Sequence, residues 1–135
     1  MKVEHAKRLD EQDHRSLVLW AADCAEHVLP YFEENYSEDD RPRKAIEAGH
    51  AWARGELSMS KARAAAFAAH AAARDADNVA ARAAARAAGH VADHARHAAA
   101  YAATAAGTAF ATERNWQSRR LPEHLRPVAF PPSRH

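Results

Sequence analysis

Alanine dominates residues 60–112, where Arg, His, Asp and a few aromatic residues punctuate it. Alanine has the highest helix propensity because its side chain loses no rotational entropy when the backbone becomes ordered. The stretch is therefore predicted to be helical. A buried methyl group removes little apolar surface from water, so these helices must approach one another closely and lean on larger residues elsewhere.

The N-terminal part of the chain has a helical pattern built from larger apolar residues. Asp10 or Asp13 can cap this first helix, because a short carboxylate accepts hydrogen bonds from the free amide protons there. Its apolar positions recur every three or four residues on one arc; they are Leu17, Trp20, Ala21, Cys24, Val28 and Tyr31. Pro30 interrupts the helix. An aromatic anchor is predicted just after it, formed by Tyr31, Phe32 and Tyr36.

Two further helices are marked by their end signals. Pro42 fits the first turn of a second helix, where its missing amide proton costs nothing. Gly55 is a natural C-terminal stop for that helix. A third helix is predicted to start after a Ser58 or Ser60 cap and to run to about Arg74.

The remaining punctuation divides the second half of the alanine-rich stretch. Asp77 is predicted to cap a fourth helix that begins near Val79. Gly89 marks a kink or a joint, after which helix is expected to resume from His90 to about Trp116. Several prolines then follow and prevent another long helix.

The predicted fold is all-α: a compact bundle of about five alanine-rich helices with an irregular, proline-containing C-terminal tail. One helical-bundle domain is expected in residues 1–120, and a short turn with an irregular tail in residues 121–135. Close alanine faces also suit pairing between two chains, so a homodimer is one expected state. The larger residues predicted to pin the bundle are Trp20, Tyr31, Phe32, Tyr36, Trp52, Phe67, Phe110 and Trp116.

A row of polar residues stands out if the helix after Gly89 is continuous with the one before it. At 100° per residue the row occupies one narrow arc; its members are Arg86, His90, Asp93, His97, Tyr101, Thr104 and Thr108. A solvated helix face explains the row, and a binding row is the alternative. His90 and His94 are spaced as metal-binding imidazoles on a helix are. No second ligand cluster, CxxC or HExxH motif accompanies them, so we predict neither a metal nor a cofactor.

His94 lies at the boundary between the polar row and the alanine face, and His70 has a similar place on the third predicted helix. Buried histidines of this kind usually have structural hydrogen bonds. If the protein is an enzyme, the expected catalytic residues are Asp23, His70 and His94, pointing into one cavity. Cys24 lies on an apolar arc, which is typical of packing rather than of a nucleophile.

Composition limits the partners and the compartment. The 135 residues carry a formal net charge of +1, which gives no electrostatic reason to expect nucleic-acid or membrane binding. The single cysteine excludes an internal disulfide framework and fits a reducing cytosol. The N-terminus has no apolar core of a signal peptide, and charges interrupt the alanine stretch before it could span a membrane. We therefore expect a cytoplasmic protein.

Several of these stretches, in this order, resemble the immunity-5-like family of immunity proteins from bacterial polymorphic toxin systems. The stretches are Leu19–Leu29, Arg41–Leu57, Ala62–Arg74, Ala81–Ala102 and Glu113–Arg126. The resemblance implies an all-helical cytoplasmic protein whose partner is a cognate toxin. Family members carry about two more helical turns between the positions of Gly89 and His90. The polar residues that match the family are Asp23, His70, Arg74, His90 and His94.

The resemblance and the absence of a catalytic motif predict a binding protein, rather than an enzyme, that neutralises a toxin by direct contact. The expected binding residues are Arg74, Arg86, His90, Asp93, His97 and Tyr101. The alternative is a small enzyme or ligand-binding protein that uses a His/Asp/Arg pocket between helices, in a specialised biosynthetic pathway. A metal-binding helical protein and a plain helical scaffold remain further alternatives.

Overall fold

The computed structural model describes residues 10–131, and all regular elements in that range are helical. The longer helices are α2 (Glu11–Val28), α4 (Arg41–Ala53), α5 (Met59–Asp75), α6 (Val79–His90), α7 (Ala95–Ala105) and α8 (Phe110–Arg120). The short elements are α3 (Pro30–Glu33), α9 (Arg126–Ala129) and the 3-10 turns at Gly107–Ala109 and Glu123–Leu125. The predicted all-α class is confirmed.

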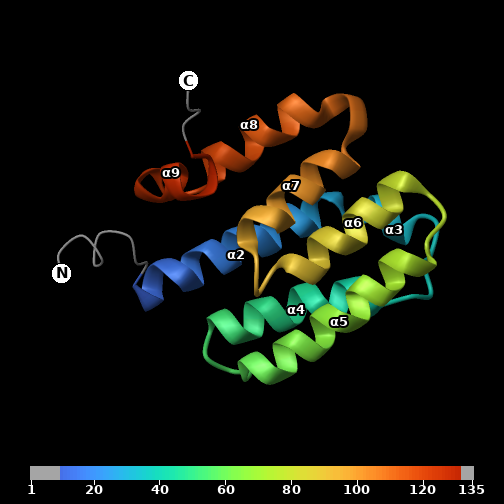
Figure 1. Ribbon diagram of the computed structural model, residues 1–135, viewed down its shortest axis with the longest axis horizontal. Coiled ribbons are helices and arrows are strands. Elements are labelled where there is room, and N and C mark those ends of the chain that lie inside the picture. The colour runs from blue at the N-terminus through green and yellow to red at the C-terminus, as the bar shows by residue number, and fades with distance from the viewer. Residues whose placement is uncertain (1–9, 132–135) are drawn as a thin grey trace.

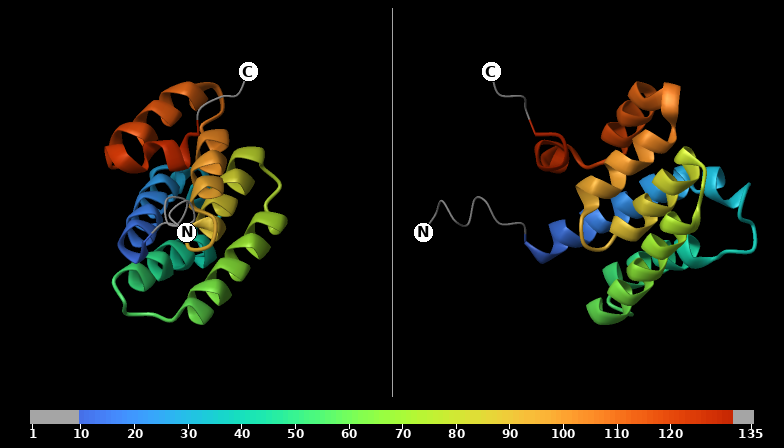
Figure 2. Two further views of the ribbon diagram at one scale, coloured as in Figure 1. Left: turned by 60° about the vertical axis from the view of Figure 1, so that its left-hand side comes forward. Right: turned by 45° about the vertical axis from the view of Figure 1, so that its right-hand side comes forward.

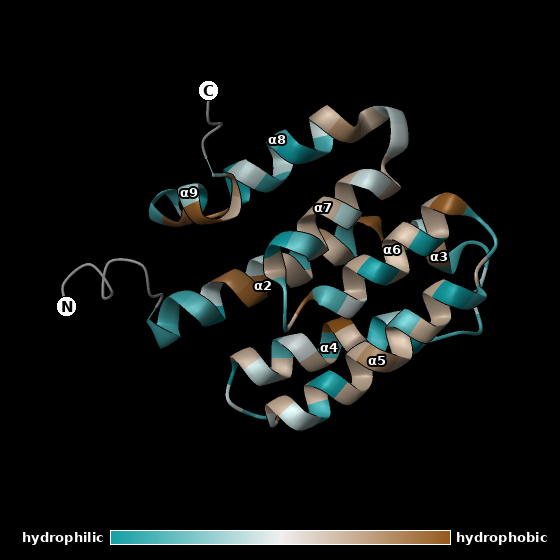
Figure 3. Ribbon diagram, viewed as in Figure 1, coloured by the Kyte–Doolittle hydropathy of each residue, from teal (hydrophilic) through white to brown (hydrophobic). Residues whose placement is uncertain are grey.

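Helices α5, α6 and α7 lie side by side in chain order and form the front of the molecule in Figure 1. Helix α2 passes behind α6 and α7, and α4 packs against both α5 and α2. Helix α8 packs on α7, and α9 returns toward the first half of α2 (Figure 2). The outward side of α5, α6 and α7 is left uncovered, and hydrophilic residues recur along it (Figure 3).

Three of the longer helices, α2, α5 and α6, start at short polar caps. Asp10 accepts a hydrogen bond from the amide of Asp13, and Ser58 accepts one from the amide of Lys61, as predicted for α2 and α5. The prediction for α6 is wrong: Asn78, not Asp77, caps this helix, through a 2.9 Å bond from the amide of Ala81. The carboxylate of Asp77 instead accepts a hydrogen bond from the Tyr36 hydroxyl.

The chain reverses direction between α6 and α7, just after the kink or joint predicted at Gly89, whereas the predicted polar row required a continuous helix. Helix α6 ends at His90, and a connection at residues 91–94 leads to α7. Val91 in this connection is fully buried. A second break falls at Gly107, which has a φ of +62°. The predicted last helix is therefore two helices, α7 and α8, because alanine favours helix everywhere and does not itself mark a break.

The core combines close alanine packing with a few large side chains. A Cβ atom on Gly49 of α4 would lie 2.5 Å from Cγ1 of Val91, so the Val91 side chain packs directly on the α4 backbone. The largest fully buried side chains include Leu29, Phe32, Leu121 and Leu125. The bundle thus uses small residues where helices meet and larger apolar residues at their ends.

The predicted aromatic pins are only partly correct. Trp20 and Phe32 are buried, and Phe32 stacks on Tyr36 with ring centroids 5.1 Å apart. Tyr31, Phe67 and Phe110 are exposed, Phe67 to 74%. Phe67 lies on the outward side of α5, where no other described helix covers it, so it does not anchor the core.

The C-terminal segment packs on the bundle. Leu121, Leu125 and Ala129 are buried, and the Trp20 indole donates a 2.7 Å hydrogen bond to the backbone carbonyl of Gln117. The short turn predicted near residues 122–126 is present. The division of the chain at residue 120 stays a prediction. The predictions for residues 1–9 and 132–135 fall outside the described residues.

Candidate functional site

Three rows of side chains on α5, α6 and α7 form one surface, which we call the histidine–arginine face. The α5 row is Arg63, Phe67, His70 and Arg74. The α6 row is Arg82, Arg86 and His90. The third row, on α7 and the residue before it, is His94, His97, Tyr101 and Thr104. The single row predicted from the sequence is therefore divided into two rows, one on α6 and one on α7, which the helix reversal places side by side.

His90 is the centre of a cluster of rings on this face. Its ring centroid lies 4.6 Å from that of His70, 5.6 Å from that of His94 and 5.5 Å from that of His97. The His90 ring also stacks parallel to Tyr101, with centroids 5.3 Å apart. Three separate segments thus bring four imidazoles together.

Gly89 allows this cluster to form. A Cβ atom at Gly89 would lie 2.6–2.8 Å from three atoms of the His70 ring. The ring therefore rests directly on the α6 backbone, and any larger residue would push it away. Gly89 was predicted to be a kink or a joint, and α6 in fact continues through it to His90.

Burial and crowding keep the central imidazole uncharged. Desolvation, followed by the positive charges that His70, His97, His94 and Arg86 can carry, lowers the pKa of His90 to about 4. Burial also lowers the pKa of His70, and Arg86 and Arg74 add to that effect. Both rings are therefore neutral near pH 7.

The guanidinium groups of this face differ in how they are paired. Arg63 meets Asp93 at 3.3 Å. Arg74, Arg82 and Arg86 form no ion pair with any carboxylate of residues 10–131. Among the described residues, 10–59 contain 12 acidic and 5 basic side chains, whereas 60–131 contain 5 acidic and 10 basic ones. The neutral overall charge therefore hides a cationic α5–α6–α7 layer.

A recess of about 250 Å³ lies on this face between α6 and α7. Its lining residues are Val79, Arg82, Ala83, Arg86, Tyr101 and Thr104. The Arg86 guanidinium carbon lies 6.0 Å from the centre of the Tyr101 ring, which holds this cation over an aromatic surface. Arg82 was not among the predicted site residues, although it precedes Arg86 by four residues, as Arg86 precedes His90.

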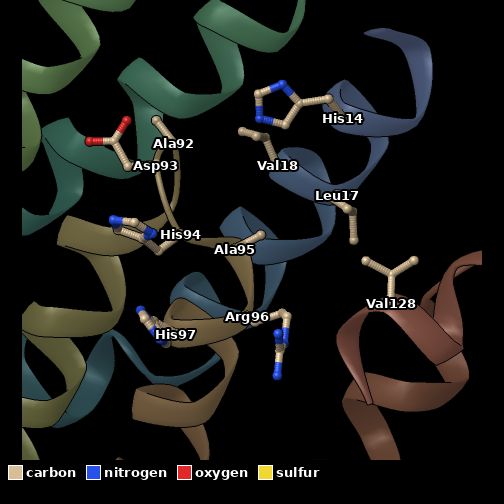
Figure 4. A pocket seen from close by; sticks show the side chains of 10 residues that line it. All are labelled: His14, Leu17, Val18, Ala92, Asp93, His94, Ala95, Arg96, His97 and Val128. Atoms are coloured by element: carbon tan, nitrogen blue, oxygen red, sulfur yellow. The ribbon is translucent and has the colours of Figure 1, made fainter. Parts of the chain in front are cut away.

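A second recess, of about 320 Å³, lies between α2, the start of α7 and α9. Leu17 and Val128 face each other across it, with His14 farther along α2 (Figure 4). The side chains of Asp93, His94 and His97 turn to the opposite side of the connection. This recess is therefore mainly apolar, although histidines belong to its lining.

The structure separates Asp23 from the histidines, contrary to the predicted shared cavity. Asp23 lies on α2, pairs with Arg120 of α8 at 3.7 Å, and lines a different recess. His70 and His94 are joined only through His90, which contacts both. The reason is topological: α2 presents Asp23 toward α8, while α5 and α7 present their histidines on the front layer.

A pair that sequence reasoning missed lies near Asp23. His27 Nδ1 is 2.7 Å from Oε2 of the buried Glu113, and the His27 ring stacks on Trp116 with centroids 3.8 Å apart. These contacts fasten α8 to α2. The residues are 86 positions apart in the chain, so no local spacing marks them.

Two chemical possibilities can be judged directly from the described residues. No group of three or more His, Cys, Asp or Glu side chains within residues 10–131 is arranged to hold a metal ion. Cys24 is buried, and desolvation raises the pKa of its thiol far above the usual range, which is the opposite of an activated nucleophile.

No helix of the described part of the chain is long and apolar enough to cross a membrane.

The fold and the face define a small all-helical protein with a rigid, histidine-rich cationic surface. Comparison with protein families identifies it further: the chain belongs to the family described as "Imm-5 like putative immunity protein", whose model matches residues 7–124. The comparisons with curated proteins and with solved structures find no match. Family membership, expected from the sequence, is confirmed.

Proposed function

We propose that this protein binds a cognate toxin and neutralises it by direct contact through the histidine–arginine face. The observation that carries the proposal is the uncovered α5–α6–α7 layer. It presents three guanidinium groups without carboxylate partners among the described residues, beside the exposed ring of Phe67. Arginine and aromatic residues dominate the binding energy of protein interfaces. Family membership supports a toxin as the partner.

Rigidity of the face also supports binding. The helices beneath it pack through alanines that are buried completely or nearly so, and Gly89 holds His70 against α6. A surface already in its bound arrangement loses less conformational entropy on association. Five of the six binding residues predicted from the sequence lie on α5, α6 and α7; they are Arg74, Arg86, His90, His97 and Tyr101. The sixth, Asp93, lies in the α6–α7 connection and pairs with Arg63.

Co-expression with a candidate toxin encoded by a neighbouring gene tests the proposal. The wild-type protein is expected to restore growth and to co-purify with the toxin. Phe67→Ala combined with Arg74→Ala removes an exposed aromatic ring and one cation from the face. Because neither side chain is buried, this variant should remain folded yet bind the toxin at least about tenfold more weakly.

The matched control is Arg119→Ala, which removes an exposed cation from α8, away from the face. This variant should protect as well as the wild type. Absence of both rescue and complex with the wild-type protein would refute toxin neutralisation. Equal losses for the control and the face variant would refute the face as the contact surface.

A second candidate, a ligand-binding protein or small enzyme, is favoured by one specific recess. Asp23, His27 and Arg120 converge there with Trp116, around a volume of about 210 Å³ between α2 and α8. The buried Glu113 orients the His27 ring. This candidate predicts that His27→Gln abolishes binding of a small ligand while the protein stays folded, and a screen by ligand-observed NMR would check it.

A further inference from the structure

We infer that the recess between α6 and α7 is a carboxylate-binding site, and that the partner inserts an aspartate or glutamate side chain into it. The inference deepens the proposed function, and it rests on that function in one respect: the identification of the toxin as the partner that supplies the side chain. The binding chemistry itself rests only on the side chains of the recess.

Both arginines of the recess belong to α6, and a different contact holds each side chain in place. Arg82 donates from Nε to the carbonyl oxygen of Ala76 at 2.7 Å, so its terminal nitrogens remain for another acceptor. Arg86 is held over the Tyr101 ring one turn further along α6. A guanidinium presents its donors in a planar fork that matches the two oxygens of a carboxylate. Two such groups on adjacent turns therefore favour a carboxylate ligand.

The acidic groups nearby are engaged with other partners. Asp93 pairs with Arg63, and Asp75 pairs with Arg41 of α4. Asp77 accepts a hydrogen bond from Tyr36. Asp77 lies close enough to Arg82 for their charges to interact, but no carboxylate of residues 10–131 forms an ion pair with Arg82 or Arg86, so an external carboxylate would supply that partner.

The size and lining of the recess favour a protein side chain as the ligand. Its volume of about 250 Å³ lies below the usual range for drug-sized ligands, so it suits a single inserted group. Val79 and Ala83 give it an apolar wall that can contact the methylene groups of a glutamate. Val79 is 75% exposed, so it also offers contact area at the rim.

A nucleic acid is less suited to this recess. A polynucleotide needs a track of cations that follows successive phosphates. The formal net charge of the chain is only +1, and the recess itself is lined by two guanidiniums, those of Arg82 and Arg86. The experiment nevertheless includes an oligonucleotide, because binding of such a polyanion at the recess would contradict the inference.

The test is an NMR titration of the full-length protein with acetyl-tetraglutamate amide. The Nε–H signals of Arg82 and Arg86 and the backbone signal of Tyr101 should shift together, and the shifts should weaken as sodium chloride rises. Acetyl-tetraglutamine amide, which has the same length without charge, should bind about tenfold more weakly or not at all. Inorganic phosphate and an oligothymidylate are titrated separately.

The variant that tests the geometry is Arg86→Lys, which keeps the charge but lacks the guanidinium fork. We expect about fivefold weaker peptide binding, whereas the matched control Arg119→Lys should bind within about twofold of the wild type. If the wild-type signals do not shift at the recess, or if Arg86→Lys binds as tightly as the wild type, the inference is wrong. Tighter binding of phosphate or oligothymidylate at the recess would also overturn it.

The titration contains no toxin, so its outcome is independent of the co-expression experiment. Peptide binding without toxin rescue would leave the carboxylate site standing and refute the proposed function. Toxin rescue without peptide binding would support the proposed function and refute the carboxylate site. Should Arg86→Lys prove unfolded by circular dichroism, Arg82→Lys gives the same comparison one turn earlier on α6.

Discussion

Val91 is the residue that holds the reversal between α6 and α7 in place. Its side chain is completely buried and touches the position where Gly49 lacks a side chain. A methyl group at Gly49 would overlap Cγ1 of Val91 at 2.5 Å, and close-packed interiors yield little to such overlap. One glycine on α4 thus determines how tightly the connection can approach the core.

Gly49→Ala should therefore destabilise the protein, although alanine is the better helix former. We expect a loss of about 2–3 kcal/mol in the free energy of unfolding, measured by urea denaturation. In a Val91→Ala background the same substitution should cost much less, because the overlapping methyl group is gone. Equal costs in the two backgrounds would show that the overlap is not the cause.

His90 makes stability depend on pH. Its pKa is about 4 in the folded protein, compared with about 6.5 for an unperturbed histidine. Between these values the unfolded chain binds more protons, so stability falls as pH decreases from about 6.5 to 4. Allowing for solvent screening of a half-buried ring, the loss should be about 1–2 kcal/mol.

Thermal unfolding measured from pH 7.5 to pH 4 checks this expectation. His90→Gln should flatten the decrease, since an amide does not titrate in this range. His50→Gln, which changes a histidine on α4 outside the cluster, should leave the pH profile unchanged. An identical profile for His90→Gln and the wild type would contradict the role of His90.

At the scale of elements, helix ends in this chain depend on which short polar residue reaches the free amides. Asp77 and Asn78 are adjacent, and both are good cap residues. Asn78 caps α6 in the structure. Asp77 is engaged elsewhere, because its carboxylate accepts a hydrogen bond from the Tyr36 hydroxyl and its amide donates one to the oxygen of that hydroxyl. A tertiary contact thus decides between two caps that are locally equivalent.

Asn78→Ala should cost about 1 kcal/mol, because it leaves the first amides of α6 without a side-chain acceptor. Asn78→Asp keeps an acceptor oxygen at the same position and should retain most of the stability. Urea denaturation of both variants makes the measurement. A loss for Asn78→Asp as large as that for Asn78→Ala would show that capping is not what the side chain provides.

The packing of the helices also explains the positions of the candidate catalytic residues. Asp23 was predicted to share a cavity with His70 and His94, but α2 carries it to the α8 side, where it pairs with Arg120. The pair of His27 and Glu113 lies there as well. This arrangement depends on packing between helices that are far apart in the sequence, which the local residue pattern does not indicate.

At the scale of the whole molecule, charge is separated between the two halves of the chain. The acidic excess lies in residues 10–59 and the basic excess in residues 60–131, so the net charge of +1 conceals a cationic layer. Complementary charge steers partners and selects among them. The small net charge opposes general nucleic-acid binding, whereas the local excess favours an acidic protein surface. The expected homodimer stays a prediction that sedimentation equilibrium can address.

The sequence by itself determined the all-helical class, most helix starts, the family and most of the polar residues of the histidine–arginine face. These follow from propensity, capping and periodicity, which act over a few neighbouring residues. Only the tertiary structure decided that the chain reverses after His90, that four histidines meet, and that Arg82 and Arg86 share a recess with Tyr101. Alanine supports any helix length equally, so the break between α6 and α7 was placed by distant contacts such as the Val91–Gly49 packing.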